Sequence, residues 1–480
     1  MARSRAAQSQ QKTLSLFDIE DSDEADLVED RVNPESRQGG LRDAPAQTKE
    51  TIRASTVASV SGLMEQVVAA ENMRAALKRI EQNKGAAGVD GMTVKQLRPW
   101  LHSHWRTLKQ SLLDEAYRPQ PVKRVEIPKS SGGVRKLGIP TVTDRLVQQA
   151  ILQVLTPLFD PHFSPASFGF RPGKRGHSAV RQAREYVREG YAWVVDMDLE
   201  KFFDRVNHDM LMARVARRVS DRLLLRLIRR FLESGVLVDG LVSASEEGTP
   251  QGGPLSPLLS NILLDDLDKE LERRGHKFVR YADDCNIYVR SRRAGERVKA
   301  SITAYLEGCL RLRVNEGKSA VDRPWKRKFL GFSLLAQARR IRLAAESVKR
   351  VKEVIRSLTQ RSDAVSMTER LRRLNQYLGG WAGYFALAET PSVFSELDEW
   401  TRRRLRLCQW KQWKRIRTRV RELRALGLKE LDVWEAAGSR KAYWRIAASP
   451  PLHKAMGLAY WRRRGLVPLA DRYQAIRNGW

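Results

Sequence analysis

The sequence predicts an α+β protein, with short strands in the middle of the chain and helices towards both ends. Residues 122–139 alternate apolar and polar side chains around a SerSerGlyGly turn, and residues 278–291 follow the pattern strand, tight turn, strand. Apolar residues recur at helical spacing between residues 61 and 113, and again beyond residue 347. A chain of 480 residues, 42% of them hydrophobic, is long enough for two or three domains with a substantial core.

The charge of the chain points to a polyanionic partner. The formal net charge is +31 and the isoelectric point lies near 10.4, an excess that is typical of proteins that bind nucleic acid. A membrane surface is the alternative, but no apolar run approaches the ~20 residues of a spanning helix and no secretory signal is recognisable. We therefore expect an intracellular protein with no membrane partner. The three cysteines, at positions 285, 309 and 408, are too scattered for a disulfide framework or CxxC zinc sites.

Residues 1–60 differ from the rest of the chain. The segment from Asp18 to Asp30 holds eight acidic and no basic residues, which predicts a disordered acidic arm. Screening of a basic binding groove and simple solubilisation are both plausible roles for such an arm. Two helical segments follow, one from Thr93 to Leu113 and, before it, one with a single buried stripe made of Leu63, Val67, Val68, Leu77 and Ile80.

Asp283 and Asp284 are the first candidates for chemistry. They occupy the predicted turn between the strands Phe278–Tyr281 and Cys285–Val289, and the second strand alternates residue types as a half-exposed strand would. Two adjacent carboxylates repel each other unless a cation lies between them. Aspartate is also a common residue of purely structural turns, so the pair alone does not decide between the two roles.

A second pair of acids ends the apolar strand Tyr191–Leu199. Asp196 and Asp198 share one face of this strand because side chains alternate with a period of two. An acid at the end of a buried strand is also typical of a helix cap. Together with the pair at 283 and 284, however, Asp198 supplies the third carboxylate that a two-metal polymerase site needs.

Three further segments suggest contacts with nucleotides. The hairpin at 122–139 carries Lys129 and Arg135, which suit a triphosphate, although a solvated charged hairpin is equally expected. The segment 167–174 is no Walker A loop, because only three residues separate its glycines at 169 and 173 and no Ser or Thr follows the Lys. The Gly- and Pro-rich segment 248–257 opens a predicted helix at Leu258–Leu271, and Gln251 within it could hydrogen-bond a nucleotide.

Six segments, in this order, resemble the reverse transcriptases of bacterial group II introns, from about residue 61 to the C-terminus. They are IPKSSGGVRKLGIP, SFGFRPG, VVDMDLEKFFDRVNHD, GTPQGGPLSPLLSNILLDDLD, YADD and KFLGF, and the variants YADDCNIYVRS and RPWKRKFLGF resemble the class C subgroup in particular. The resemblance implies a right-hand polymerase with fingers and an antiparallel-sheet palm, followed by an α-helical thumb and a small helical DNA-binding domain. It implies fingers and palm with an N-terminal extension at 61–335, the thumb or maturase domain at 336–425 and the DNA-binding domain at 426–480, behind the acidic arm that composition predicts at 1–60.

The resemblance also implies roles for individual residues. Two Mg²⁺ ions, for which Mn²⁺ could substitute, would be held by Asp198, Asp283, Asp284 and the main-chain carbonyl of Leu199. The incoming dNTP would meet Lys129, Arg135, Gln251 and Phe203, the last of which matches the bulky residue that excludes a 2′-hydroxyl. Template and primer contacts would come from Arg171, Lys318, Phe329 and Gly331.

The C-terminal part of the chain is basic and helical. Helices are predicted from Ser347 to Leu358, from Met367 to Leu387 and from Pro391 onwards. Residues 401–480 contain 21 Lys or Arg against five acids, a net charge of +16 that would grip a nucleic acid. Trp413 lies among cations and suits base stacking, but its helical spacing is more typical of a core residue. No His- and Cys-rich segment is recognisable, so we expect no endonuclease domain. The resemblance to class C relatives then implies that the intron moves into nicked or single-stranded DNA.

The hypothesis is an RNA-directed DNA polymerase that is also a maturase. It would bind its group II intron RNA, assist splicing without supplying the chemistry, and copy the RNA from a DNA primer with dNTPs during retrohoming. We expect it to act in the bacterial cytoplasm, and at the nucleoid when it acts on DNA. The alternatives are a domesticated enzyme of the same fold that serves DNA repair or defence, and an RNA-binding splicing factor with a vestigial polymerase site. A basic protein that merely coats nucleic acid leaves the ordered motifs unexplained.

Overall fold

The computed structural model describes residue 17 and residues 62–128, 134–238, 241–243, 248, 252–336 and 340–479. The predicted acidic arm, apart from Phe17, lies outside the described residues, as do Lys129 and Gln251. The chain divides into two compact units, one formed by residues 1–175, 197–287 and 296–320 and the other by residues 176–196, 288–295 and 321–480. In the part of the chain that is described, no helix is both long and apolar enough to cross a membrane.

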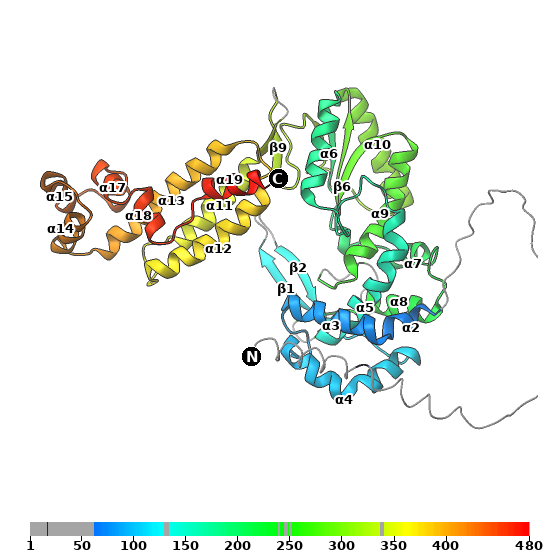
Figure 1. Ribbon diagram of the computed structural model, residues 1–480. Helices are drawn as coiled ribbons and strands as arrows, with labels where there is room; N and C mark the ends of the chain where they lie inside the picture. Colours follow the sequence, from blue (N-terminus) through cyan, green and yellow to red (C-terminus); the bar gives the residue numbers. More distant parts are fainter. Residues whose placement is uncertain are drawn as a thin grey trace, which may run out of the picture. The chain divides into compact units, whose positions relative to one another are not determined.

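The first helices of the chain confirm the predicted buried stripe. All five of its residues are buried, but the stripe belongs to two helices separated by Ala69, α2 (Leu63–Val68) and α3 (Ala70–Asn83). Both pack on α5 (Val142–Phe159), as Figure 1 shows. The predicted helix after Thr93 is α4 (Val94–Leu113), which begins with a capping box between Thr93 and Gln96. The first unit also contains η1 (Asp160–His162), η2 (Phe202–Asp204), α7 (His208–Val215), α8 (Arg222–Glu233), α9 (Ser256–Arg273) and most of α10 (Arg292–Cys309).

The predicted hairpin at 122–139 is confirmed. Its arms β1 (Val122–Pro128) and β2 (Val134–Ile139) pair antiparallel, with Ile127 opposite Arg135. The sequence did not predict that β1 would also pair in parallel with β4 (Val236–Val238), which is followed by β5 (Leu241–Ser243) in the order β2-β1-β4-β5.

A second four-stranded sheet carries the aspartates. Its order is β6-β7-β3-β8, formed by Lys277–Tyr281, Asp284–Val289, Trp193–Met197 and Ala320–Asp322. The division between the two units passes through this sheet, since β3, β7 and β8 each contribute residues to both. A two-stranded sheet, β9 (Phe332–Leu334) with β10 (Ile341–Leu343), belongs to the second unit.

Strand β7 is more deeply buried than the sequence predicted. Residues 285–289 were expected to form a half-exposed strand, but all five are buried. β7 lies between β6 and β3, Tyr288 packs against Tyr186 of α6 (Gly176–Arg188) with ring centroids 5.6 Å apart, and Cys285 faces the apolar side chains of α9 and α10. A strand that is covered on both faces has no solvent side, so alternating residue types do not report exposure here.

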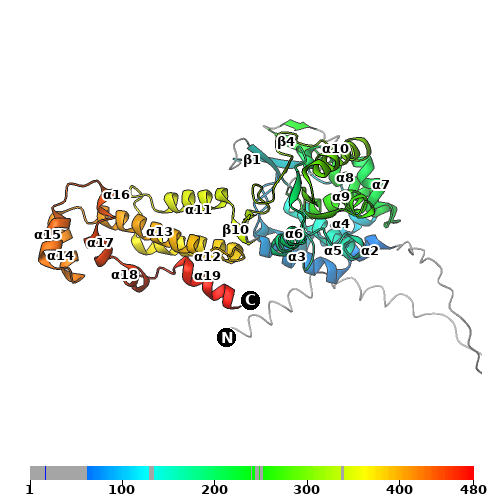
Figure 2. The same cartoon turned by 90° about the horizontal axis from the view of Figure 1, so that it is seen from above.

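Long helices dominate the second unit. The three predicted helices are confirmed as α11 (Ala345–Leu358), α12 (Met367–Phe385) and α13 (Pro391–Gln412). The last helix, α19 (Leu469–Asn478), packs on α12 and α13, where the rings of Phe394 and Tyr473 lie 4.4 Å apart (Figure 1). Figure 2 shows the short helices between α13 and α19, which are α14 (Ile416–Ala425), α15 (Glu430–Ala437), α16 (Tyr443–Ile446), α17 (Pro450–Ala455) and α18 (Leu458–Arg463).

Two buried polar side chains of α13 fasten these C-terminal helices. Burial lowers the pKa of Arg406 to about 10, which still leaves its guanidinium charged at neutral pH. The guanidinium donates hydrogen bonds to the carbonyls of Ala447 (2.7 Å) and Met456 (3.4 Å) and lies 2.8 Å from Nε2 of His453. The Asp398 carboxylate accepts the backbone N–H groups of residues 469 and 470, at 2.8 and 2.9 Å, and so caps the start of α19.

Candidate active site

The turn between β6 and β7 has the predicted strand, turn, strand form. Ala282 and Asp283 connect the two strands, and Asp284 is the first residue of β7. Asp283 is half-buried and Asp284 is exposed. Ala282 has φ of +58°, a left-handed conformation that costs a residue with a side chain roughly 1–2 kcal/mol. The surroundings must therefore hold the turn in place.

The buried side chain of Arg280 holds the turn between β6 and β7 in place. Arg280 is 0% exposed, and its guanidinium forms a two-pronged ion pair with Asp268 of α9, with N···O distances of 2.7 and 2.6 Å. Burial lowers the pKa of Arg280 and the facing Asp268 carboxylate raises it; the net direction is upward, so the group stays charged. The remaining N–H groups donate to Oδ1 of Asn261 (3.0 Å), Oγ of Ser167 (2.9 Å) and the carbonyl of Ala282 (2.9 Å). The turn is thereby tied to α9 and to the loop around residue 167.

Gly169 lets that loop touch the turn. A Cβ atom at position 169 would lie 2.2 Å from the amide nitrogen of Ala282 and 2.9 Å from the carbonyl carbon of Tyr281. Only glycine permits such an approach between two backbones. The carbonyl of Gly169 accepts a hydrogen bond from Nδ2 of Asn261 at 2.8 Å. The SFGF loop, α9 and the aspartate turn thus form one rigid block.

Asp198 lies just beyond the end of β3 and is positioned by residues 313–319. Its backbone N–H donates to Oγ of Ser319 (3.0 Å), and its carbonyl accepts from the N–H of Asn315 (2.8 Å). The next residue, Leu199, bridges to Val314. The Lys318 ammonium, with a side chain 60% exposed, lies 3.7 Å from Oδ2 of Asp198. Asp198 therefore has a fixed backbone and a carboxylate that already faces one cation.

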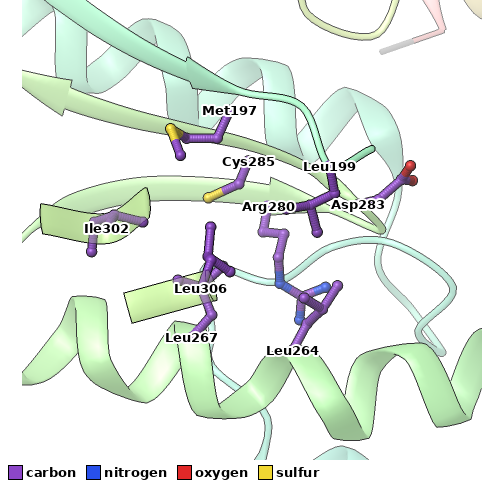
Figure 3. Close-up of a pocket in the computed structure, with 9 residues that line it drawn as sticks. All are labelled: Met197, Leu199, Leu264, Leu267, Arg280, Asp283, Cys285, Ile302 and Leu306. Atoms are coloured by element: carbon purple, nitrogen blue, oxygen red, sulfur yellow. The ribbon is translucent and has the colours of Figure 1, made fainter. Parts of the chain in front are cut away.

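The structure brings Asp198 and the aspartate turn to the same end of the sheet. Met197 and Leu199, the neighbours of Asp198, line one pocket with Asp283 and Cys285 (Figure 3). The other lining residues are Arg280, Leu264 and Leu267 of α9, and Ile302 and Leu306 of α10. Its interior is apolar, and the Asp283 carboxylate points away from these apolar side chains in Figure 3. The Asp283 carboxylate thus lies outside this apolar interior and can face a ligand.

The chemistry of the three carboxylates fits a divalent cation. Carboxylate and carbonyl oxygens are the hard donors that Mg²⁺ prefers, usually together with water and substrate phosphates. Among the described residues, no three His, Cys, Asp or Glu side chains converge into a ready-made metal cluster.

Asp196 belongs to a separate ion pair. Its Oδ2 accepts hydrogen bonds from Nε and Nη2 of Arg327, at 2.8 and 2.6 Å. Asp196 lies within β3 and Asp198 one residue beyond its end, and Asp196 is engaged by a residue 131 positions away.

The described residues of the segment 248–252 lie near Phe203 at one end and near β2 at the other. Phe203 is half-buried in η2 and packs edge-on against Phe202, with ring centroids 5.2 Å apart. The N–H of Gly248 donates to the carbonyl of Val206 (2.8 Å), and the Gly248 carbonyl accepts from Nε2 of His208 (2.6 Å), so the segment that leads to position 251 starts beside Phe203. A Cβ at residue 252 would lie 2.5 Å from the carbonyl oxygen of residue 138 in β2, the strand that carries position 135.

The residues expected to contact template and primer have different surroundings. Arg171 has a side chain only 7% exposed, and its guanidinium donates to Oδ1 of Asp160 (2.7 Å) and to the carbonyls of residues 160, 164 and 167. Phe329 exchanges two backbone hydrogen bonds of 2.9 Å with Phe332 across the turn that contains Gly331. The Gly331 carbonyl accepts from Oγ of Ser347 at 2.8 Å. Trp413 is 6% exposed and is a core residue, which rules out base stacking in this conformation.

Sequence reasoning missed Arg280 and Ser319. A signal for Arg280 was present, since a charged residue inside an otherwise apolar, buried strand needs a partner. No comparable signal existed for Ser319, whose contact with Asp198 spans 121 residues.

Family models match two adjacent parts of the chain. The model of the reverse transcriptase (RNA-dependent DNA polymerase) matches residues 127–334. The model of the group II intron, maturase-specific domain matches residues 348–427. The catalytic candidates at 198, 283 and 284 lie inside the first match, and α11 to α14 lie almost entirely inside the second.

Individual relatives agree with these models. Protein YkfC of Escherichia coli K12 is 35% identical over 50% of this chain and 73% of its own length. The group II intron-encoded protein LtrA of Lactococcus lactis subsp. cremoris is 37% identical over 43% of this chain and 34% of its own length. Among solved structures, the partial Cas6-RT-Cas1–Cas2 complex matches with 27% identity over 51% of this chain and 42% of that chain, at a TM-score of 0.34. With the polymerase model over its central residues and the maturase model directly behind it, this chain belongs to the family of group II intron reverse transcriptases and maturases.

Proposed function

We propose that this reverse transcriptase extends a DNA primer with dNTPs on its own group II intron RNA, and that it assists the splicing of that RNA as a maturase. The observation that supports the proposal is that Met197 and Leu199, the neighbours of Asp198, line one pocket with Asp283, beside the buried Arg280 that holds the turn. A rigid support suits catalysis, because carboxylates held in advance need no reorganisation when charge develops.

Asp198, Asp283, Asp284 and the carbonyl of Leu199 are the proposed ligands of two Mg²⁺ ions, with Mn²⁺ as a substitute. Such ions lower the pKa of the primer 3′-hydroxyl and offset the charge of the leaving pyrophosphate. The contacts of the Asp198 backbone with Ser319 and Asn315 support this role, because they fix the direction of its side chain.

Lys129, Arg135, Phe203 and Gln251 are the proposed contacts of the incoming dNTP, with Phe203 under the sugar. The start of the 248–253 segment beside Phe203, and its close approach to β2, support this grouping. For template and primer we propose Lys318, Phe329 and Gly331 as direct contacts. Arg171 would act on the template and primer indirectly, by holding the loop 160–170 in shape.

The second unit supports the maturase role. We propose that residues 336–425 form the thumb, that residues 426–480 bind the DNA target, and that both clasp the intron RNA without supplying splicing chemistry. The net charge of +16 over residues 401–480 suits these polyanions. We also propose that the DNA target is nicked or single-stranded, as in class C relatives, and that the protein acts in the bacterial cytoplasm.

Asp283→Ala is the central test. It should abolish cDNA synthesis on a primed RNA with Mg²⁺ and dNTPs, yet leave intron binding and splicing within about twofold of the parent, because the substitution removes a ligand and no RNA contact. Asp209→Ala, which removes a surface carboxylate that is 79% exposed, is the matched control and should leave both activities unchanged. Loss of splicing by the folded Asp283→Ala protein would refute the separation of the two roles.

Splicing and primer-extension assays of the unmodified protein distinguish the proposed function from the two alternatives. Splicing without any primer extension would identify a non-catalytic splicing factor. Primer extension without specific binding to a group II intron RNA would identify a polymerase that serves repair or defence.

A further inference from the structure

Phe170 combines two features that are unusual for phenylalanine. Its φ is +56°, a region that bulky residues rarely adopt, and its side chain is 55% exposed. Neither feature favours folding, because the backbone is strained and the ring gains little from burial. Strained residues of this kind cluster at functional sites, where the surrounding structure enforces them.

The backbone is held on both sides of Phe170. On one side, Gly169 packs against the backbone of Tyr281 and Ala282 and accepts a hydrogen bond from Asn261. On the other side, Arg171 is anchored by four hydrogen bonds within the loop 160–167. Phe170 therefore cannot relax its φ angle without breaking one of these anchors, and its ring stays outside the core.

The ring lies next to the catalytic turn. Its centroid is 6.3 Å from that of Tyr281, with 44° between the ring planes. Tyr281 is two residues from Asp283, a chain distance of at most about 7 Å. The two rings are therefore within reach of the nucleotides adjacent to the catalytic carboxylates. Lys174 adds a positive charge to the same loop, 5.0 Å from the ring centroid of Phe168.

We propose that Phe170, together with Tyr281, binds the sugar edge of the template–primer duplex at the primer terminus. This assignment rests on the proposed polymerase function. The bases of a duplex are stacked on one another, so a ring that approaches from the side meets sugars and base edges, which the wide, shallow minor groove of an A-form duplex displays. An apolar ring suits this contact, and such a contact is independent of base sequence.

Phe170→Gly separates a role in binding from a role in folding. Glycine adopts φ of +56° without strain but gives the unfolded chain more freedom, and the two effects partly offset each other, so the variant should unfold no lower than the parent and at most about 2 °C higher. Loss of the ring should weaken binding of an RNA template–DNA primer duplex on the order of tenfold. Binding is measured by fluorescence anisotropy without dNTPs, and unfolding by circular dichroism. Phe170→Ala should weaken binding equally without the gain in Tm, and Phe170→Tyr should bind within about twofold of the parent.

Trp100→Ala is the matched control. Trp100 is a partly exposed aromatic residue of α4 that stacks on His104 at 4.5 Å, and its removal should leave duplex binding unchanged. The proposal is overturned if Phe170→Gly binds the duplex as tightly as the parent. It is also overturned if Phe170→Gly lowers Tm, because the ring would then serve packing. If the proposed polymerase function is wrong, the unmodified protein will bind the duplex but add no nucleotide. This outcome is distinct from the two that overturn the role of Phe170.

Discussion

At the scale of single residues, the buried pair of Arg280 and Asp268 couples stability to the position of the turn between β6 and β7. Both side chains are 0% exposed, and the same guanidinium supports the carbonyl of Ala282. A buried ion pair contributes little net stability compared with apolar residues, but the loss of one partner leaves an uncompensated charge. The pair is therefore better explained by the geometry it imposes on the turn than by the stability it adds.

Arg280→Met should lower the free energy of unfolding by about 3–5 kcal/mol, because Asp268 remains buried without its partner. Urea denaturation measures this change. The double variant Arg280→Met with Asp268→Leu should recover most of the stability but not cDNA synthesis, since the carbonyl of Ala282 has still lost its donor. Full recovery of both properties would show that the arginine does not position the turn.

The buried carboxyl group of Asp265 should make the stability of the protein depend on pH. Burial raises the pKa of its carboxyl from 3.8 to about 6, and Oδ1 has no hydrogen-bond partner among the described residues. The folded state binds this proton more tightly than the unfolded state, so the folded state is favoured at low pH. That advantage is lost as the pH rises from about 4 through about 6. Asp265→Asn should therefore gain Tm relative to the parent as the pH rises from about 4 through about 6, and keep a constant difference above that. A difference that does not change with pH would contradict the assignment.

At the scale of elements, the contact between the SFGF loop and the β6-β7 turn is made backbone to backbone. A loop and a hairpin more than 100 residues apart in the chain meet through Gly169, where no side chain fits. Small displacements of this loop would therefore be transmitted directly to Asp283.

Gly169→Ala should reduce kcat of cDNA synthesis by about 100-fold, since misplacement of reacting groups by about 1 Å has an effect of this size. Intron binding should persist, because the substitution removes no basic residue. Gly173→Ala on the same loop is the matched control, because nothing lies within 4 Å of the added Cβ there, although its φ of +71° adds backbone strain. Steady-state kinetics compare the two variants, and equal losses of kcat would show that the clash with Ala282 is not the cause.

At the scale of the whole molecule, the excess positive charge and the catalytic carboxylates lie in different parts of the chain. Residues 401–480 carry +16 of the total +31, whereas the carboxylates lie between residues 198 and 284. Nucleic-acid affinity and catalysis should therefore respond to different substitutions.

Intron RNA affinity should fall steeply with salt, and replacement of three α14 arginines should flatten that dependence. Arg417, Arg421 and Arg424 are exposed and share one helical face by their spacing. Their simultaneous change to Gln should reduce the slope of log K against log salt by roughly 2, since each phosphate contact contributes ~0.7–0.9. Arg226→Gln, at an exposed arginine paired with Glu115, is the control. Filter binding between about 50 and about 400 mM salt measures the slopes. Equal slopes for the triple variant and the parent would show that the RNA does not contact these three arginines.

Much of the fold was predictable because its signals are local. Helical periodicity identified α4 and α11 to α13, and a turn between two alternating segments identified both hairpins. The proposal of Asp198, Asp283 and Asp284 as a set also came from the sequence, since motif order and strand periodicity are properties of neighbouring residues. It stays a prediction, and the structure adds that the neighbours of Asp198 line one pocket with Asp283.

Other features were decided only by the tertiary structure. Asp196 and Asp198 look alike in the sequence, yet Asp196 is bound by Arg327 while Asp198 is positioned by Ser319 and Lys318. Strand β7 is buried on both faces because of its place in the sheet. The contacts that distinguish the two aspartates join residues more than 100 positions apart, which no local pattern encodes, and the burial of β7 depends on the strands and helices that cover it.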